Sequence, residues 1–129
     1  MAEDFLNFDF EDTYEPVAIP EGEYMVRVIN AEVKSGRKGP FLILRLDVPE
    51  EPTAKDMTHV LMLPTENDDA KQANRRKLAI KRLLEATGIG LGGFSPEQLV
   101  GSTFYAYLVE EESEEYGTQN RIRRILTGA

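Results

Sequence analysis

The sequence contains no cysteine and only one histidine. It therefore has no thiol nucleophile, disulfide or thiolate-bound zinc, and His59 alone cannot build a histidine-rich metal site. Apolar runs are only a few residues long, and the first ten residues are acidic where a secretory signal would be basic. We therefore expect an intracellular protein with no cofactor, no metal and no membrane association.

The formal net charge of the 129 residues is −8, but the charges are unevenly distributed. Residues 1–23 hold eight acids and no base, and residues 110–116 hold five glutamates. In contrast, residues 24–46 hold five bases and one acid, and residues 70–82 hold six bases and no acid. Because net charge does not describe distribution, an acidic chain of this kind can still present a cationic surface.

The chain length favours one domain preceded by an arm. Residues 1–17 alternate acids with Phe5, Phe8 and Phe10 and end in a proline-containing segment that breaks regular structure. We expect these residues to be peripheral and residues 18–129 to form the domain.

The domain sequence alternates as β-strands do. Residues 24–33 change parity near Ile29 and Asn30, which predicts a β-bulge that bends one long strand. The strongest alternation follows in residues 41–48, after a Gly-rich turn. Further strands are expected at residues 56–63, 103–109 and 120–126, with an acidic loop, residues 110–119, before the last.

One long helix is predicted between the third and fourth strands. Thr65, with Asp68 three residues later, is expected to begin it, and Gly88 to end it. One side carries an apolar stripe for packing, and the other carries a cationic cluster. The cationic cluster consists of Lys71, Arg75 and Arg82.

A short helical turn capped by Ser95 precedes the fourth strand. The resulting order is three strands, a helix and two strands. It fits a mainly β fold, a five-stranded Greek-key barrel of OB type with one α-helix between strands three and four.

The first predicted hairpin combines cations with an aromatic side chain. Lys34, Arg37 and Lys38 lie in the turn, and Phe41 and Arg45 have outward parity on the next strand. Binding of a single-stranded nucleic acid requires a cationic groove and exposed aromatic rings. Alternatively, Phe41 caps the barrel end and the cations only solubilise the hairpin.

Four further candidates lie on the last two strands. Tyr105 and Tyr107 have outward parity and are either stacking platforms or cover for the helix or a partner chain, which leaves a homodimer open. Arg121 and Arg123 are expected to share one side of the last strand, where they contact phosphate or protect an edge strand. The helix cations either extend such a path or form a solvated face.

Segments of the chain also resemble a known family. IPEGEYMVRVINAEVKSGRKGPFLILRLDV, HVLMLPT, LVGSTFYAYLV and YGTQNRIRRI share its positional preferences: PEG before strand one, a basic Gly turn, Gly before strand four and Asn at the start of strand five. Over residues 18–126 the chain is similar to small bacteriophage proteins, formerly of unknown function, regarded as OB-type single-stranded-DNA-binding proteins. The resemblance implies sequence-independent binding of single-stranded DNA in replication or recombination, in the host cytoplasm.

The acidic arm distinguishes this chain from that functional class, in which an acidic, Phe-containing segment often lies at the C-terminus. Here such a segment lies at the N-terminus. It competes with DNA for the basic groove, docks onto replication or recombination proteins, solubilises the chain, or adds an edge strand. Two other functions stay open: a protein-interaction module, and an acidic DNA mimic that binds a partner protein and not DNA.

No residues suggest an enzyme. The glutamates of residues 110–115 lack a neighbouring nucleophile, histidine or phosphate-binding loop. Met57 and Met62 are expected in the core, and His59 is expected to be an ordinary strand residue. We therefore expect a binding protein with no catalytic site.

Overall fold

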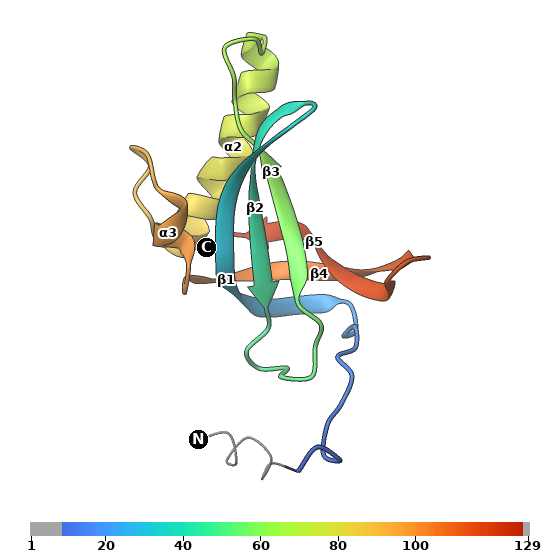
Figure 1. Ribbon diagram of the computed structural model, residues 1–129. Helices are drawn as coiled ribbons and strands as arrows, with labels where there is room; N and C mark the ends of the chain where they lie inside the picture. The colour runs from blue at the N-terminus through green and yellow to red at the C-terminus, as the bar shows by residue number, and fades with distance from the viewer. Residues whose placement is uncertain (1–8, 128–129) are drawn as a thin grey trace, which may run out of the picture.

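The computed structural model describes residues 9–127 of the chain (Figure 1). The first three strands precede a long helix, and a single-turn helix and two further strands follow it. These elements are β1 (Gly22–Gly36), β2 (Gly39–Asp47), β3 (Met57–Met62), α2 (Ala70–Thr87), α3 (Pro96–Leu99), β4 (Thr103–Ser113) and β5 (Gly117–Leu126).

The five strands form one antiparallel sheet in the order β3-β2-β1-β4-β5. This confirms a mainly β fold with five strands and one long helix between the third and fourth strands. Within residues 9–127, no strand pairing joins β3 to β5, so the sheet is not closed into a barrel.

The sheet is bent at β1, which belongs to both of its halves. Val28 pairs with Leu46 and Asn30 with Arg45, so Ile29 is the extra residue of a β-bulge, as predicted. Residues 22–27 pair with β4, and residues 27–36, which include the bulge, pair with β2. In Figure 1, β2 and β3 consequently stand upright while β4 and β5 run across them.

The core lies on the inner face of the bent sheet, under α2. Leu42, Leu44 and Leu46 of β2 alternate into it and are fully buried. From the predicted helix stripe, Leu83 and Leu84 pack against them. The hydrophobic pattern of period two in the strands and 3.6 in the helix therefore gives the main packing interface correctly.

Helix α2 begins at a different residue from the predicted one and ends at the predicted residue. The N-cap is Asp69, whose Oδ1 accepts a hydrogen bond from the Gln72 backbone at 2.7 Å, and not Thr65. Asp68 accepts from the Thr65 N–H at 2.9 Å, but it also forms an ion pair with Arg76 at 3.0 Å, so this pair of residues makes a turn before the helix. Gly88 ends the helix as predicted, with a left-handed φ of 76°.

The acidic loop is shorter than predicted. Strand β4 continues through Glu110–Glu112 to Ser113, and β5 begins at Gly117, which takes a positive φ of 73°. The glutamate side chains of β4 are exposed beyond the core, where solvation stabilises them. The hairpin therefore projects as a long acidic ribbon (Figure 1).

The N-terminal segment joins the domain near Val17. Val17 forms a bridge with Ala54, and the buried Ile19 exchanges backbone hydrogen bonds with the Asn120 side chain at 2.8 and 2.9 Å. Phe10 and Tyr14 are 64% and 62% exposed. Of the predicted arm, residues 1–8 lie outside the described residues.

Two general findings hold for residues 9–127. No helix there is long and apolar enough to cross a membrane. No three acidic or imidazole side chains gather there in an arrangement that can hold a metal ion.

Candidate nucleic-acid interface

The solvent side of the β1–β2–β3 half carries the predicted hairpin residues. Strand alternation buries the leucines of β2 and turns the intervening side chains outward. Side chains directly opposite one another in the register share this side. We call it the outer face; it consists of Asn30, Glu32, Lys34, Phe41, Ile43, Arg45, Thr58, Val60 and Met62.

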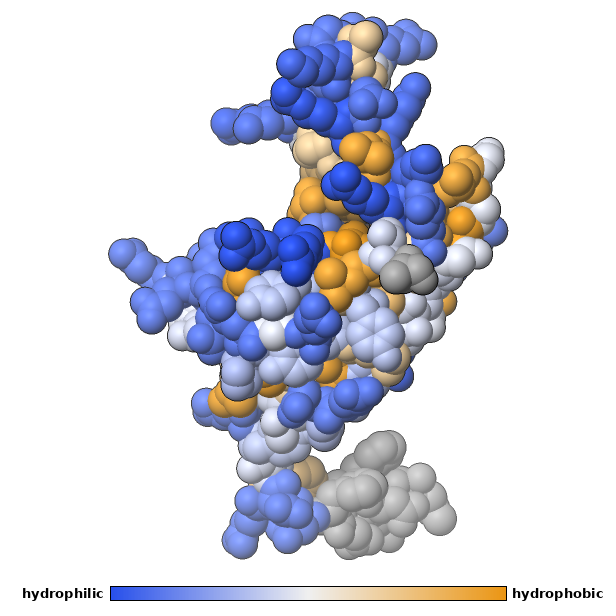
Figure 2. Space-filling view, turned by 180° about the vertical axis from the view of Figure 1, so that it is seen from behind, coloured by the Kyte–Doolittle hydropathy of each residue, from blue (hydrophilic) through white to orange (hydrophobic). Residues whose placement is uncertain are grey.

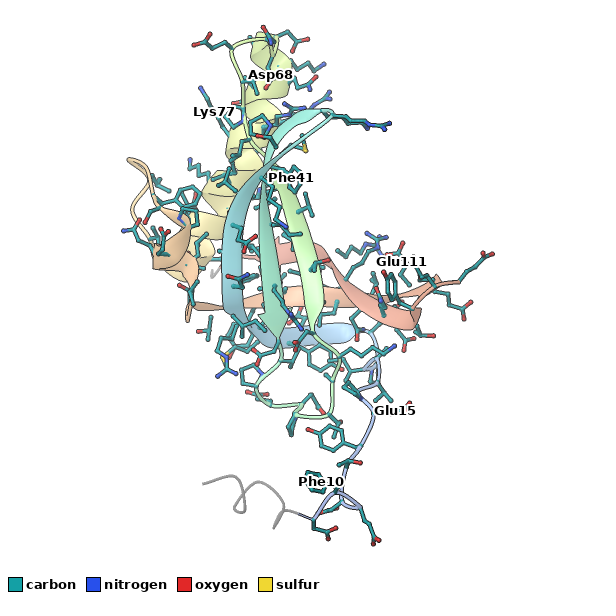
Figure 3. All side chains as sticks on the ribbon, viewed as in Figure 1. Phe10, Glu15, Phe41, Asp68, Lys77 and Glu111 are labelled. Atoms are coloured by element: carbon teal, nitrogen blue, oxygen red, sulfur yellow. The ribbon has the colours of Figure 1, made fainter. Side chains whose placement is uncertain are left out.

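The apolar part of the outer face surrounds Phe41. Lys34 lies opposite Phe41 on β1, and Met62 lies opposite it on β3. The next row holds Ile43 and Val60, which is 48% exposed. The result is a half-buried aromatic ring bordered by half-buried and exposed aliphatic side chains, at the base of the β1–β2 hairpin (Figure 3).

The Phe41 ring is held against the hairpin backbone. A Cβ atom placed on Gly36 would lie 3.1 Å from the ring Cε1, so the ring covers Gly36 closely. Any larger residue at position 36 would have to displace the ring. The absence of a side chain at Gly36 therefore lets the Phe41 ring lie in this position.

The tip of the hairpin presents two cations. Arg37 and Lys38 form the turn between Gly36 and Gly39, and the positive φ of 110° that the turn needs falls on Gly39. Among residues 9–127, neither cation has a carboxylate partner. Both are therefore free to contact an anion.

The other cations of the outer face are paired. Lys34 lies 3.6 Å from Glu32, and Arg45 lies 3.0 Å from Asp56. Exposed pairs of this kind contribute only about 0–1 kcal/mol, so a phosphate can replace the carboxylate. The hairpin end of the face is consequently the more cationic, and the end near Asp56 is acidic.

The predicted tyrosines lie on the other half of the sheet. Tyr105 pairs with Met25 of β1. Phe41 pairs with Lys34, nine residues further along the same strand. At about 3.3 Å per residue, the two aromatics are up to about 30 Å apart along β1.

Tyr107 lies beside an arginine that was not among the predicted site residues. The Arg124 guanidinium carbon is 5.6 Å from the Tyr107 ring centroid, a cation–π distance. Tyr107 is half-buried, whereas Tyr105 is 57% exposed. Tyr105 is thus the more accessible ring on this half.

Arg121 and Arg123, which were expected to share one side of β5, differ in their pairing with β4. A bulge places Arg123 as the unpaired residue, because Tyr107 pairs with Arg124 and Leu108 with Ile122. Arg121 forms an ion pair with Glu111 at 2.9 Å on the acidic ribbon (Figure 3).

Sequence reasoning missed part of the outer face. Met57 is buried as predicted, but Met62 is half-buried on the outer face beside Phe41. The two methionines differ in parity on one strand, and that signal would have separated them. Val60 was missed for the same reason.

Comparison with known proteins identifies no family for this chain. No family model matches the chain, and no curated protein sequence is significantly similar to it.

Proposed function

We propose that this protein binds single-stranded DNA without sequence preference, in DNA replication or recombination. The observation that carries the proposal is the outer face, where the half-buried Phe41 ring and the exposed Val60 lie next to Arg37 and Lys38, which have no carboxylate partner among residues 9–127. Partly exposed apolar and aromatic side chains beside cations make this face a candidate binding surface. The adjacent cations favour an anionic ligand.

Each part of the face has a role in this mechanism. One base stacks on Phe41, and Ile43 and Val60 contact neighbouring bases. Arg37 and Lys38 bind phosphates directly, and the paired cations of the face bind them by exchange. Every base has a π-face and every nucleotide a phosphate, so such a surface does not discriminate between sequences.

The fold supports the same proposal. The strand order with one helix between β3 and β4 fits an OB-type barrel that is open between β3 and β5. Domains of this type bind oligonucleotides on the strand-two and strand-three face and its flanking loops. Here the β4–β5 ribbon is acidic and repels phosphates, so the strand is confined toward the β1–β2 hairpin.

The experiment is a titration of fluorescent oligo-dT with the wild-type protein and the Arg37→Ala, Lys38→Ala double variant. The variant should bind more weakly, with a log–log salt slope reduced by about 1.4, because two phosphate contacts are lost at about 0.7 each. The matched control removes Lys77 and Lys81 in the same way, since both line a hollow on α2 that no residue of the hairpin tip borders.

Two results would contradict the proposal. Absence of oligo-dT binding by the wild-type protein at low salt would favour a protein-interaction module or a DNA mimic. Equal losses in the two double variants would show that only net charge matters and that the outer face is not the site.

A further inference from the structure

A hollow lies between β3 and β5, where the sheet is open. It has a volume of about 380 Å³ and is bordered by β3, β5 and α2. Its apolar walls include Leu61 and Ile122, and its polar groups are His59, Arg82, Arg123 and Arg124. We call this hollow the β3–β5 slot. Seen from behind, apolar surface lies in a hollow between the α2 part and the β4–β5 part, with strongly hydrophilic side chains beside it (Figure 2).

The arginines of the slot are not neutralised. Within residues 9–127, Arg82, Arg123 and Arg124 have no carboxylate partner, whereas Arg76 and Arg121 each have one. Three arginines from two elements therefore border one hollow in a chain with an excess of acids. Their mutual repulsion is relieved by a bound anion.

One flank of α2 carries further cations beside Arg82 of the slot. At 3.6 residues per turn, Lys71, Arg75 and Arg82 fall within about 40° of one another around the helix. Another hollow, near the start of this helix, is lined by Arg37 and Lys38 of the hairpin. The hairpin hollow and the slot thus both border α2, the first at Gln72 and Arg76 and the second at Ala79 and Arg82.

Strand β3 separates the slot from the outer face. Its alternate residues Val60 and Met62 belong to the outer face, while His59 and Leu61 line the slot. As an edge strand, β3 has no neighbouring strand on the slot side within the described residues. A polynucleotide that leaves the outer face across this edge therefore meets the slot next.

We propose that the β3–β5 slot binds a phosphate group, and that its source is a phosphodiester of the same DNA strand after it crosses the edge of β3. Guanidinium groups match phosphate oxygens in geometry and bind them through paired N–H donors. The DNA source rests on the proposed function, whereas the phosphate chemistry rests on the arginines of the slot alone.

His59 makes the slot directly observable. It is the single histidine of the chain, so its ring protons give unambiguous NMR signals. Burial lowers its pKa, and the charged groups that border its hollow are the arginines of α2 and β5. A phosphate bound there favours the protonated ring and moves its titration midpoint upward.

The test follows the His59 signal against pH with and without oligo-dT. We expect an upward shift that the Arg82→Ala, Arg123→Ala double variant loses, together with a salt slope lower by about 1.4. The Lys77→Ala, Lys81→Ala control should keep both, because these residues line a hollow on the other flank of α2 (Lys77 is labelled in Figure 3).

The possible failures are separable. If oligo-dT binds and Phe41 signals move but the His59 midpoint does not, the slot proposal is wrong while the proposed function stands. If oligo-dT does not bind, the proposed function is wrong. The slot proposal is then tested by titrating His59 with inorganic phosphate and in a chloride-matched buffer. A His59 shift with phosphate supports a phosphate site, and no shift overturns it.

Discussion

Replacing Phe41 by alanine should weaken single-stranded-DNA binding without changing its salt dependence. The outer face carries one aromatic ring, so one base stack is lost, at about 1–3 kcal/mol. Since 1.4 kcal/mol is a factor of ten, the expected loss is roughly 5- to 150-fold. Stacking releases no counterions from the DNA, so the slope of log affinity against log salt should stay as in the wild type.

The assay is an oligo-dT titration over a series of NaCl concentrations, with Phe41→Trp as the matched control. Tryptophan keeps a stacking ring and should restore most of the affinity. Because the Phe41 ring packs on Gly36, thermal unfolding of each variant must show that the hairpin remains folded. Wild-type affinity in Phe41→Ala, or equally weak binding by Phe41→Trp, would refute stacking on this residue.

Three further substitutions test other contacts of the structure. Gly36→Ala should lower DNA affinity less than Phe41→Ala and change stability by under about 1 kcal/mol, because its Cβ displaces the ring but needs no positive φ. Asn120→Ala should destabilise the domain by about 2–4 kcal/mol in urea unfolding, because it leaves the buried Ile19 N–H and C=O without partners. Burial lowers the pKa of His59 in the folded protein. As pH falls below about 6.5, the unfolded chain therefore binds a proton before the folded protein does, and the free energy of unfolding should decrease. His59→Gln should remove that part of the pH dependence, and an unchanged profile would contradict it.

The parts of the fold that the sequence predicts correctly depend on local signals. The parity change at Ile29 is visible within a few residues and gives the bulge. The helix stop at Gly88 and the turn after Ser95 follow from single residues, and the Ser95 N–H bonds to Gln98 at 2.8 Å as expected. The start at Thr65 fails because Asp68 is held by Arg76, a competing partner eight residues later.

Two residues that carried the family resemblance have structural explanations. Gly101, before β4, takes a positive φ of 89° while its N–H bonds to the Val28 carbonyl at 2.7 Å, next to the bend in β1. Asn120, near the start of β5, fastens the N-terminal segment to the sheet through Ile19. Both roles concern the fold, so these motifs would be retained in a domain of this shape whatever its ligand.

The candidate site was predictable only as far as one hairpin extends. Phe41 lies beside the cations at the hairpin tip because they are neighbours in sequence and in register. The distance from Phe41 to Tyr105 depends on the bend in β1. Arg82 and Arg123 line the same hollow only because a helix and a strand about forty residues apart in sequence pack side by side. Such relations require the tertiary arrangement, so sequence patterns placed these residues on plausible faces but could not group them.

The acidity of the chain is compatible with DNA binding because the fold separates the charges. The β4–β5 ribbon and the loop after β2 hold acids at one end. The hairpin tip and the α2 flank at the other end hold cations without a carboxylate partner among residues 9–127, and Asp68, which also borders the hairpin hollow, is paired with Arg76. At physiological ionic strength the Debye length is about 8 Å, so a phosphate at the hairpin tip is largely screened from the distant acids. Under the proposed function, the acids therefore limit where a strand can lie more than how tightly it is held, because they keep it off the β4–β5 ribbon.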